Sequence, residues 1–355
     1  MAPPARLEVV LFRNNNRRRD CDTKTRESTI KQSFKSECEF VAWLRRSRQV
    51  RSPGLQLGIG DDAALIAPSA GHEIILTADL SIEGIHFRRD LHPPDAVGHR
   101  ALARSLSDVA AMGGRPRFAL VSLALSPRAD RLWVEKFYRG LIDLARRFDV
   151  ALVGGDTSLS AKSVMADVTV VGESPRGRAL LRCGARPGDV IYVAGTLGLS
   201  AAGLRMLRSG LKSRAATAAL RAHLYPEPQC HLGELLSQKR LASAAIDISD
   251  GLSLDLSRLL GASGVGGWIF EAKIPLSPVA ERGAAALELA LDGGEDYKLL
   301  FTVPPSKTAA LPVSFEGARL YAIGRVCEKG QGILIEGRKG TRPLIPAGYD
   351  HFRRR

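Results

Sequence analysis

Residues 95–125 read DAVGHRALARSLSDVAAMGGRPRFALVSLAL, an amphipathic segment followed by two glycines and an apolar run. Asp95 is suited to cap a helix, and Gly113–Gly114 are suited to end it. The apolar residues on one face of that helix are Ala101, Leu102, Leu106, Val109 and Ala110. Residues 118–125 have the length and composition of a buried strand. The stretch therefore predicts a helix that packs against a sheet.

The same alternation runs through the rest of the chain, and its 355 residues are enough for two domains. A Gly-, Pro- and Arg-rich stretch at 173–189 predicts the boundary between them. We expect a mixed α/β (α+β) fold with a basic, disordered extension at 1–33 and domains at 34–175 and 176–352. Strand signals fall in residues 72–80, 150–158, 164–173, 189–198, 243–252, 291–303 and 318–326, and further helices are predicted at 36–46, 131–149, 199–211 and 253–264.

The net charge of +14 raises the possibility of a nucleic-acid partner. Residues 1–51, however, hold 13 Lys and Arg against six Asp and Glu, and residues 353–355 are three more arginines. The excess charge is therefore concentrated toward the ends of the chain, and no aromatic-studded basic motif accompanies it. We expect no nucleic-acid partner.

Five scattered cysteines form no CxxC pair, so neither a disulfide framework nor a zinc site is expected. The N-terminal residues lack the apolar core of a signal peptide, and no apolar run approaches the roughly 18 residues that cross a membrane. These features predict a cytoplasmic protein without a membrane partner.

Acidic residues recur at expected strand ends or beside glycines. They are Asp61, Asp62, Asp79, Asp108, Asp156, Asp247, Asp250, Glu295 and Asp296. Their apolar neighbours raise the free-energy cost of a bare carboxylate, which arginines, shared protons or divalent cations can offset. Oxygen ligands favour Mg²⁺, Ca²⁺ or Mn²⁺ over Zn²⁺, and Mg²⁺ often binds a few carboxylates together with substrate phosphates. The adjacent glycines let backbone N–H groups approach an anion, so a metal–polyphosphate site is predicted.

Each of these features also has a simpler explanation. A Gly-Asp pair is an ordinary turn, Asp108 can pair with Arg104 one helical turn earlier, and Asp250 can cap a helix that begins at Gly251. His86 can be a hydrogen-bonded loop histidine. The chain has no G-x-x-x-x-G-K-[ST], H-R-D, D-F-G or G-x-S-x-G motif, which excludes P-loop and protein-kinase chemistry and the usual serine-hydrolase elbow.

In combination the motifs are far more specific. GIGDDAAL, TADLSIEGIHF, LARSLSDVAAMGGRP, VGGDTS, GRALLRCGARPGD, AIDISDGL, GGEDYKLLF and GYDHF follow the order found in thiamine-monophosphate kinases, and the resemblance spans residues 34–352. It implies the two-domain fold of the aminoimidazole ribonucleotide synthetase-like superfamily. The N-terminal α/β domain would bind metal and ATP and dimerise through its sheet, and a C-terminal α+β domain would follow.

The resemblance further implies an activity: magnesium-dependent transfer of the ATP γ-phosphate to thiamine monophosphate. The products would be thiamine diphosphate and ADP, in the last step of thiamine diphosphate biosynthesis. Several Mg²⁺ ions, ATP as co-substrate and a cytoplasmic homodimer are part of this expectation.

Site residues follow from the resemblance position by position. The implied metal ligands are Asp62, Thr77, Ala78, Asp79, Asp108, Asp156, Asp247 and Asp250. The implied nucleotide contacts are Tyr138, Gly155, Asp156, Arg182 and Ser249. The implied contacts to thiamine phosphate are His86, Glu295 and Tyr349. Ala78 and Cys183 replace a hydroxyl residue and a serine common in relatives, so Ala78 offers metal only its carbonyl. We predict that Asp79, Asp108 and Asp156 form the central metal scaffold, while Asp61 orients its loop.

No catalytic base is predicted, because a phosphate acceptor has a second pKa of about 6 and is already ionised at neutral pH. The obstacle is repulsion between donor and acceptor anions. One pair of like charges about 4 Å apart costs roughly 4 kcal/mol at an effective dielectric near 20. Metal ions would offset this repulsion and align the reacting groups.

Two alternatives stay open. The first is another enzyme of the superfamily, namely aminoimidazole ribonucleotide synthetase, selenophosphate synthetase or a hydrogenase maturation protein. The surroundings of Cys21 and Cys38, the C-terminal HFRRR and the segments IEGIHF and GGEDYKLLF favour the thiamine kinase instead. The second is a non-enzymatic metal- or nucleic-acid-binding protein, against which the clustered acids argue because carboxylates repel phosphate.

Overall fold

The computed structural model describes residues 34, 36–46, 52–210, 214–277 and 283–352, so the predicted extension at 1–33 lies outside the described residues. Within these ranges no helix is long and apolar enough to cross a membrane. Two main sheets organise the described chain, one built before residue 176 and one built after residue 189.

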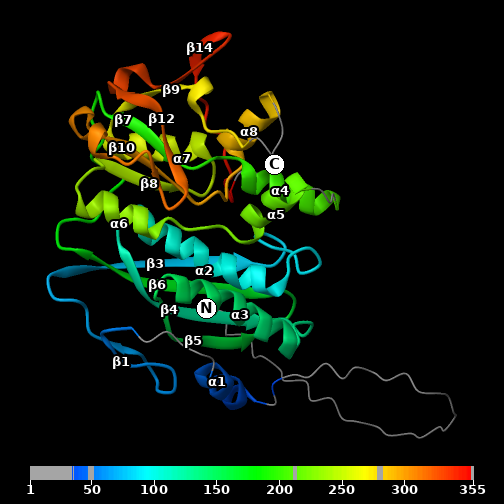
Figure 1. Cartoon of the computed structure of the whole chain (residues 1–355). Coiled ribbons are helices and arrows are strands. Elements are labelled where there is room, and N and C mark those ends of the chain that lie inside the picture. Colours follow the sequence, from blue (N-terminus) through cyan, green and yellow to red (C-terminus); the bar gives the residue numbers. More distant parts are fainter. Residues whose placement is uncertain (1–33, 35, 47–51, 211–213, 278–282, 353–355) are drawn as a thin grey trace, which may run out of the picture. The chain divides into compact units, whose positions relative to one another are not determined.

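The first sheet has four strands in the order β3-β6-β4-β5, of which only β4 and β5 run parallel. Helices α2 and α3 lie together over one of its faces (Figure 1). The strands are β3 (His72–Ile82), β4 (Arg115–Leu125), β5 (Ala151–Leu159) and β6 (Met165–Pro175), and the helices are α2 (Pro94–Ala111) and α3 (Arg131–Arg147). The helix and strand predicted from residues 95–125 are thus confirmed.

Helix α2 is buried along most of its length, because it also contacts α6 and β8 of the second half. The prediction that Asp95 caps it is wrong. The helix begins one residue earlier at Pro94, whose fixed φ suits the first helical position. The Asp95 carboxylate instead accepts a hydrogen bond from the Tyr225 hydroxyl at 2.6 Å.

The second sheet has eight strands in the order β14-β13-β9-β12-β7-β10-β8, with β11 paired to β12. Its strands are β7 (Val190–Ala194), β8 (Ala244–Ile248), β9 (Gly266–Phe270), β10 (Lys298–Val303), β11 (Ser314–Phe315), β12 (Ala318–Cys327), β13 (Ile333–Gly337) and β14 (Gly340–Pro343). The accompanying helices are α4 (Leu199–Ser209), α5 (Arg214–Leu224), α6 (Cys230–Gln238), α7 (Leu252–Ser263) and α8 (Ala284–Asp292), and short 3₁₀ turns span Glu271–Lys273, Pro305–Ala310 and Lys329–Gln331.

Smaller elements precede the first sheet. Helix α1 (Glu37–Arg46) begins after Ser36, whose hydroxyl accepts a hydrogen bond from the Glu39 N–H at 3.1 Å. Strands β1 (Leu55–Leu57) and β2 (Leu65–Ile66) form an antiparallel pair. The acidic segment GIGDD lies in the loop that joins these two strands.

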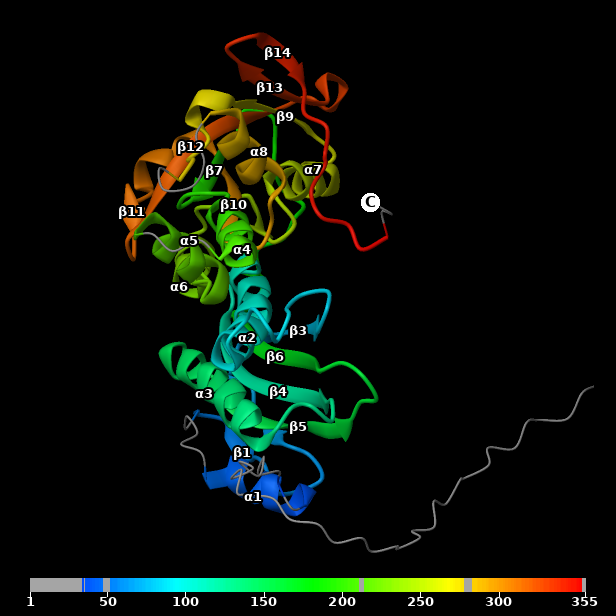
Figure 2. The ribbon, with the colours of Figure 1, turned by 90° about the vertical axis from the view of Figure 1, so that its right-hand side faces the viewer.

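Two loops of the second half are fixed by side-chain hydrogen bonds. The Asp296 carboxylate accepts from the N–H groups of Gly198 at 2.7 Å and Ser200 at 3.2 Å, which holds the turn before α4. The C-terminal segment passes beside α7 (Figure 2), where the Tyr349 N–H donates to the Asp250 carbonyl at 3.0 Å. These contacts bring chain segments far apart in sequence to one place.

Candidate functional site

A cavity of about 400 Å³, here called the central pocket, lies where α2, the end of β3, the loop after β8 and the loop before β10 meet. Eight of the residues predicted from sequence line it: Asp79, His86, Asp108, Asp247, Ser249, Asp250, Glu295 and Tyr349. Arg104 and Arg208 line the same pocket and add positive charge. The pocket therefore combines carboxylates suited to cations with donors suited to anions.

Asp79 lies on β3 and is bonded to α2, whereas Asp108 lies on α2 and is bonded to β3. Ser105 on α2 donates to the Asp79 carboxylate at 3.4 Å, and Thr77 on β3 donates to the Asp108 carboxylate at 2.5 Å. Burial raises the pKa of both carboxyl groups, and the charge of Asp108 raises that of Asp79 further. Arg104 opposes the shift at Asp79, from which its guanidinium lies 3.5 Å away. The pairing of Arg104 with Asp108 considered above is thus replaced by an ion pair with Asp79.

Asp247 completes this acidic group. Its side chain is buried at the end of β8 and accepts a hydrogen bond from the Ser107 hydroxyl at 2.7 Å. Burial raises the pKa of Asp247 most, and the negative charge of Asp108 raises it further. A cation between these carboxylates would relieve both effects.

The donor set fits Mg²⁺ bound together with phosphate better than a metal cage made by protein alone. Among the described residues, no three His, Cys, Asp or Glu side chains are arranged to hold one ion. Mg²⁺ commonly takes only one or two protein carboxylates and completes its shell with water and substrate phosphates. Carboxylates that burial and mutual repulsion destabilise are consistent with such a partial site.

The loop after β8 is held by a residue that the sequence did not single out. The Asp255 carboxylate accepts from the N–H groups of Ser249, Asp250 and Gly251 at 3.1, 2.9 and 3.2 Å. The Asp250 side chain makes no cap bond to α7 and instead accepts from Arg258 at 2.5 Å, so the simpler explanation of Asp250 as a helix cap is excluded. Asp255 thereby turns the Asp250 segment toward the central pocket.

His86 presents a hydrogen-bond donor to the central pocket. Its Nδ1 accepts from the Ile82 N–H at 3.0 Å, which places the ring proton on Nε2. That Nε2 is buried and has no partner among the described residues. Burial, with the charge of Arg104, lowers the pKa of His86 to about 4, so the ring is neutral at physiological pH. A buried donor without a partner needs an explanation, and a ligand acceptor atom is one that the position of His86 in the pocket lining allows.

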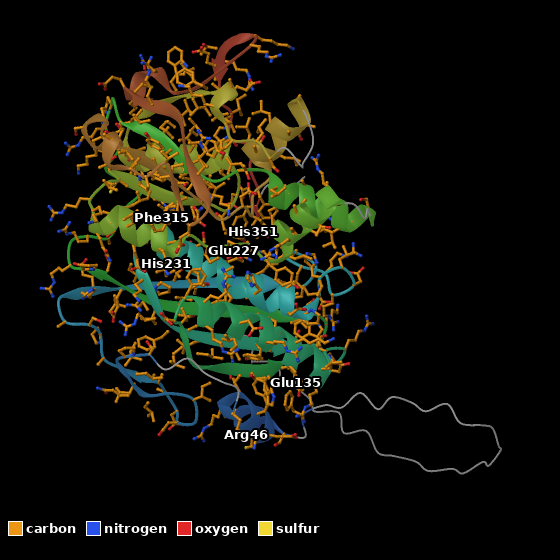
Figure 3. All side chains as sticks on the ribbon, viewed as in Figure 1. Arg46, Glu135, Glu227, His231, Phe315 and His351 are labelled. Carbon is orange, nitrogen blue, oxygen red and sulfur yellow. The ribbon has the colours of Figure 1, made fainter. Side chains whose placement is uncertain are left out.

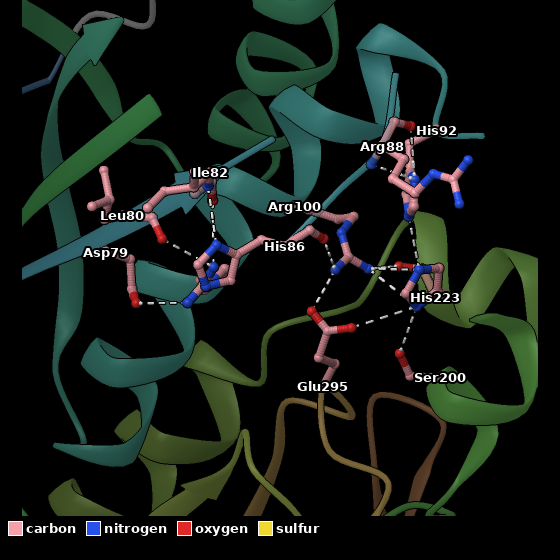
Figure 4. Close-up of polar contacts among 12 residues, drawn as sticks. Asp79, Leu80, Ile82, His86, Arg88, His92, Arg100, Ser200, His223 and Glu295 are labelled. Atoms are coloured by element: carbon pink, nitrogen blue, oxygen red, sulfur yellow. Dashed lines mark hydrogen bonds and ion pairs between the residues drawn. The ribbon is translucent and has the colours of Figure 1, made fainter. Parts of the chain in front are cut away.

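Glu295 belongs to a buried polar network that joins α2 to α5 (Figure 4). The Arg100 guanidinium donates to the Glu295 carboxylate at 2.5 Å and also to the backbone carbonyl of His223. The His223 ring lies 3.1 Å from the His92 ring, Nε2 to Nε2, and 3.2 Å from the Ser200 hydroxyl. Glu295 has a φ of 60°, which a non-glycine residue adopts only when its surroundings hold it there.

A second cavity, of about 730 Å³, holds three more of the acidic residues singled out from the sequence. It is lined by Tyr138, Gly155, Asp156 and the loop of Asp61 and Asp62. The Asp62 N–H donates to the Asp61 carboxylate at 2.9 Å, as expected for a side chain that orients its own loop. We call this cavity the open-face pocket.

The structure does not bring Asp156 together with Asp79 in one chain. Cross-strand pairing through Ser122 and Asp167 places Asp156 on the same sheet face as Leu80. Successive residues of a strand point to opposite faces, so Asp79 faces the helices while Asp156 faces away from them. The scaffold predicted from Asp79, Asp108 and Asp156 is therefore absent within a single chain.

Three further predicted residues, Ala78, Arg182 and Gly155, do not line the central pocket. Ala78 is exposed on the helix-free face of β3, next to Thr77 on the helix face. Arg182 is exposed, and its positive charge opposes the rise that burial causes in the pKa of Asp108. Gly155 has a φ of 148°, and a Cβ there would lie 1.9 Å from the Val121 carbonyl oxygen. Close packing of β4 against β5 thus requires glycine at 155 regardless of any ligand.

Comparisons with known proteins identify the family of this chain. Residues 60–174 match the AIR synthase related protein N-terminal domain, and residues 186–336 match the C-terminal domain. A thiamine-monophosphate kinase of Escherichia coli K12 is 40% identical over 326 residues, covering 88% of this chain and 98% of that protein.

Solved structures give the same result. A thiamine-monophosphate kinase from Stenotrophomonas maltophilia K279a superposes with a TM-score of 0.75 at 35% identity, covering 84% of this chain and 95% of that one. AaThiL complexed with AMPPCP and TMP superposes with a TM-score of 0.72 at 33% identity, covering 89% and 97%. With both domains matched and relatives aligned over nearly their whole length, this chain belongs to the AIR synthase related family and, within it, to the thiamine-monophosphate kinases.

Proposed function

We propose that the protein catalyses Mg²⁺-dependent transfer of the ATP γ-phosphate to thiamine monophosphate, forming thiamine diphosphate and ADP. The observation that carries the proposal is the central pocket itself, where buried carboxylates suited to Mg²⁺ lie beside the free Nε2–H of His86. The relatives named above, one of them bound to the ATP analogue AMPPCP and to TMP, support the same activity.

Each group of residues has a distinct proposed task. Asp79, Asp108, Asp247 and Asp250 would hold Mg²⁺, which supplies positive charge against the approaching phosphates. The positive charge of Arg104 lowers the electrostatic free-energy cost of placing these carboxylates together. His86 donates a hydrogen bond to the phosphate or to a ring of thiamine monophosphate. Because that phosphate is already ionised near neutral pH, no side chain has to remove a proton.

Glu295 and Tyr349 are proposed contacts of the thiamine moiety. Arg100 and Asp255 do not line the pocket, and they act as positioning residues for Glu295 and for the Asp250 loop. Tyr138, Gly155, Asp62 and Asp156 are proposed for the nucleotide and its metal, and Thr77, Ala78, Arg182 and Ser249 retain their predicted roles. The domain limits at 34–175 and 176–352 and a cytoplasmic location also stay predictions.

A homodimer would bring together the acidic residues of the central pocket and those of the open-face pocket, which lie apart within one chain. Strand β3 is an edge strand that pairs only with β6 among the described strands, and it exposes Ile74, Leu76 and Leu80 at 42%, 69% and 46%. An apolar row on an open edge strand is a surface that soluble proteins normally cover. We infer that a second copy covers it and that the open-face pocket of one chain serves the central pocket of the other.

The activity is tested with purified protein, ATP, Mg²⁺ and thiamine monophosphate. ADP and thiamine diphosphate should form in equal amounts, measured by chromatography. Free thiamine should be a poor acceptor because it lacks the ionised phosphate that attacks. ADP formation without thiamine diphosphate would contradict the proposal.

Replacing Asp79 or Asp108 by Asn should lower kcat by about 100-fold or more, because charge that stabilises the transition state is lost. Circular dichroism should show an unchanged fold. Asp143→Asn, which removes an exposed carboxylate paired with Arg146 on α3, serves as the control and should keep its activity. Near-normal turnover in both site variants would refute their role.

His86→Phe should raise the KM for thiamine monophosphate by about tenfold, the equivalent of one hydrogen bond to a charged group, with the KM for ATP unchanged. Since the pKa of His86 is about 4, the ring is neutral above roughly pH 5 and the variant-to-wild-type ratio should be flat from about pH 6 to pH 9. His72→Phe is the matched control. A ratio that follows pH in that range would show a different role.

Mixing Asp79→Asn with Asp156→Asn chains tests the shared site. If each site takes one residue from each chain, heterodimers hold one intact site, and the mixture should recover about a quarter of wild-type activity. Adding Leu76→Asp to both chains should abolish the recovery and yield monomers in light scattering, whereas Val313→Asp, an exposed change outside the first sheet, should not. A mixture as inactive as its components would exclude a shared site.

A further inference from the structure

A third cavity, of about 660 Å³, lies where the end of α3, α6 and the ends of β7, β10 and β12 meet. It shares no lining residue with the central pocket or the open-face pocket. Three of its lining residues, Glu227, His231 and Phe315, are labelled near one another in Figure 3. The activity proposed above makes no use of it.

Two cations in this cavity have no acidic partner. Lys298 begins β10 and Arg319 lies at the start of β12, with β7 running between the two strands. Within the described ranges, neither side chain makes an ion pair or a hydrogen bond to another residue. The Arg319 guanidinium lies 5.5 Å from the centre of the Tyr321 ring, which orients it without neutralising it.

The other charged groups in the cavity are already paired. Arg147 contacts Glu227 at 2.5 Å, and His231 contacts Glu316 at 2.8 Å. The two acidic residues of the cavity, Glu227 and Glu316, therefore contact other side chains, and neither contacts Lys298 or Arg319.

Gly195 and Thr196 lie beside these cations, and Thr196 adds hydrogen-bond donors. The Gly195 N–H donates to the Arg319 carbonyl at 2.8 Å, and a Cβ on Gly195 would lie 3.5 Å from Cδ of Lys298. Gly195 thus packs between the two basic residues. Thr196 also lines the cavity, and neither its hydroxyl nor its N–H has a partner among the described residues.

The surroundings favour an anion at this place. Burial lowers the pKa of the half-buried Lys298, while the carboxylates of Asp296 and Glu227 oppose that shift without contacting the ammonium. A partly desolvated cation gains most from a charge-assisted hydrogen bond to phosphate or carboxylate. The rings of Phe148, Phe315 and Tyr321 line the same cavity and suit a flat apolar group.

We propose that this cavity binds an organic phosphate that carries a planar aromatic group. The phosphate contacts Lys298, Arg319 and Thr196, and the aromatic group packs against Phe315 and Tyr321. Adenine nucleotides and thiamine phosphates share this chemistry, so the two sources are separated by experiment. The site is distinct from the one at which the enzyme transfers phosphate.

The test counts ligands on the full-length protein by native mass spectrometry and titration calorimetry, with ADP, thiamine diphosphate and inorganic pyrophosphate as probes. Wild type should bind two equivalents of ADP or of thiamine diphosphate per chain, and whichever probe reaches two identifies the source. Pyrophosphate, which has no ring, should bind the second site about tenfold more weakly, as expected from loss of aromatic contacts.

Arg319→Gln and Lys298→Gln should each lower the affinity for the second ligand equivalent by about tenfold or more, because one charged hydrogen bond is lost. Arg325→Gln is the matched control: Arg325 lies on the same strand over Trp268 at 5.6 Å and outside the cavity, so its second equivalent should persist. The KM values for ATP and thiamine monophosphate should not change in Arg319→Gln.

A single equivalent of every probe up to about 1 mM in wild type, or an unchanged second equivalent in both Arg319→Gln and Lys298→Gln, would overturn the proposal. An equal loss of the second bound equivalent in Arg325→Gln would also overturn the proposal, because the effect would then come from the change in net charge alone. Ligand counts do not depend on turnover, so failure of the proposed activity and failure of this site are separate results.

Discussion

Repulsion among buried carboxylates is the constraint on which the central pocket depends. Asp79, Asp108 and Asp247 lie close enough for the charge of one to raise the pKa of another, and burial adds to that cost. Hydroxyl groups of Thr77 and Ser107 and the guanidinium of Arg104 offset part of it. In the proposed function a divalent cation would remove the remaining cost, so the unfavourable electrostatics of the pocket would also be the source of its affinity for that cation.

Helix α2 places these groups. Arg100, Arg104 and Asp108 follow one another at four-residue intervals, so they form a polar stripe along one side of the helix. The apolar stripe of the same helix packs on the first sheet, whereas Arg100 contacts Glu295 and Ser107 contacts Asp247 in the second half. One helix thereby supplies the hydrophobic contacts of one sheet and the charged contacts between the two halves.

Much of the fold followed from local pattern. The apolar periodicity of α2 and α3 and the apolar runs of β4, β6 and β8 gave correct elements, because these signals are repeated every two to four residues. Helices α5, α6 and α8 were not predicted, and neither were the strands β9, β13 and β14, which are only 5, 5 and 4 residues long. The acidic residues were recognised individually, and eight of the predicted residues share the central pocket.

The sequence by itself determined that acids and glycines cluster at strand ends and that their order matches one family. Only the tertiary structure decided which of them meet. Strand register turned Asp156 away from Asp79, helical packing gave Arg104 to Asp79 rather than Asp108, and the fold of the loop gave the capping role to Asp255. Residues such as His223 entered the network across 123 positions of chain from Arg100. Local sequence encodes periodicity and turn chemistry, whereas partners at such separations are set by packing of whole elements, which no short stretch contains.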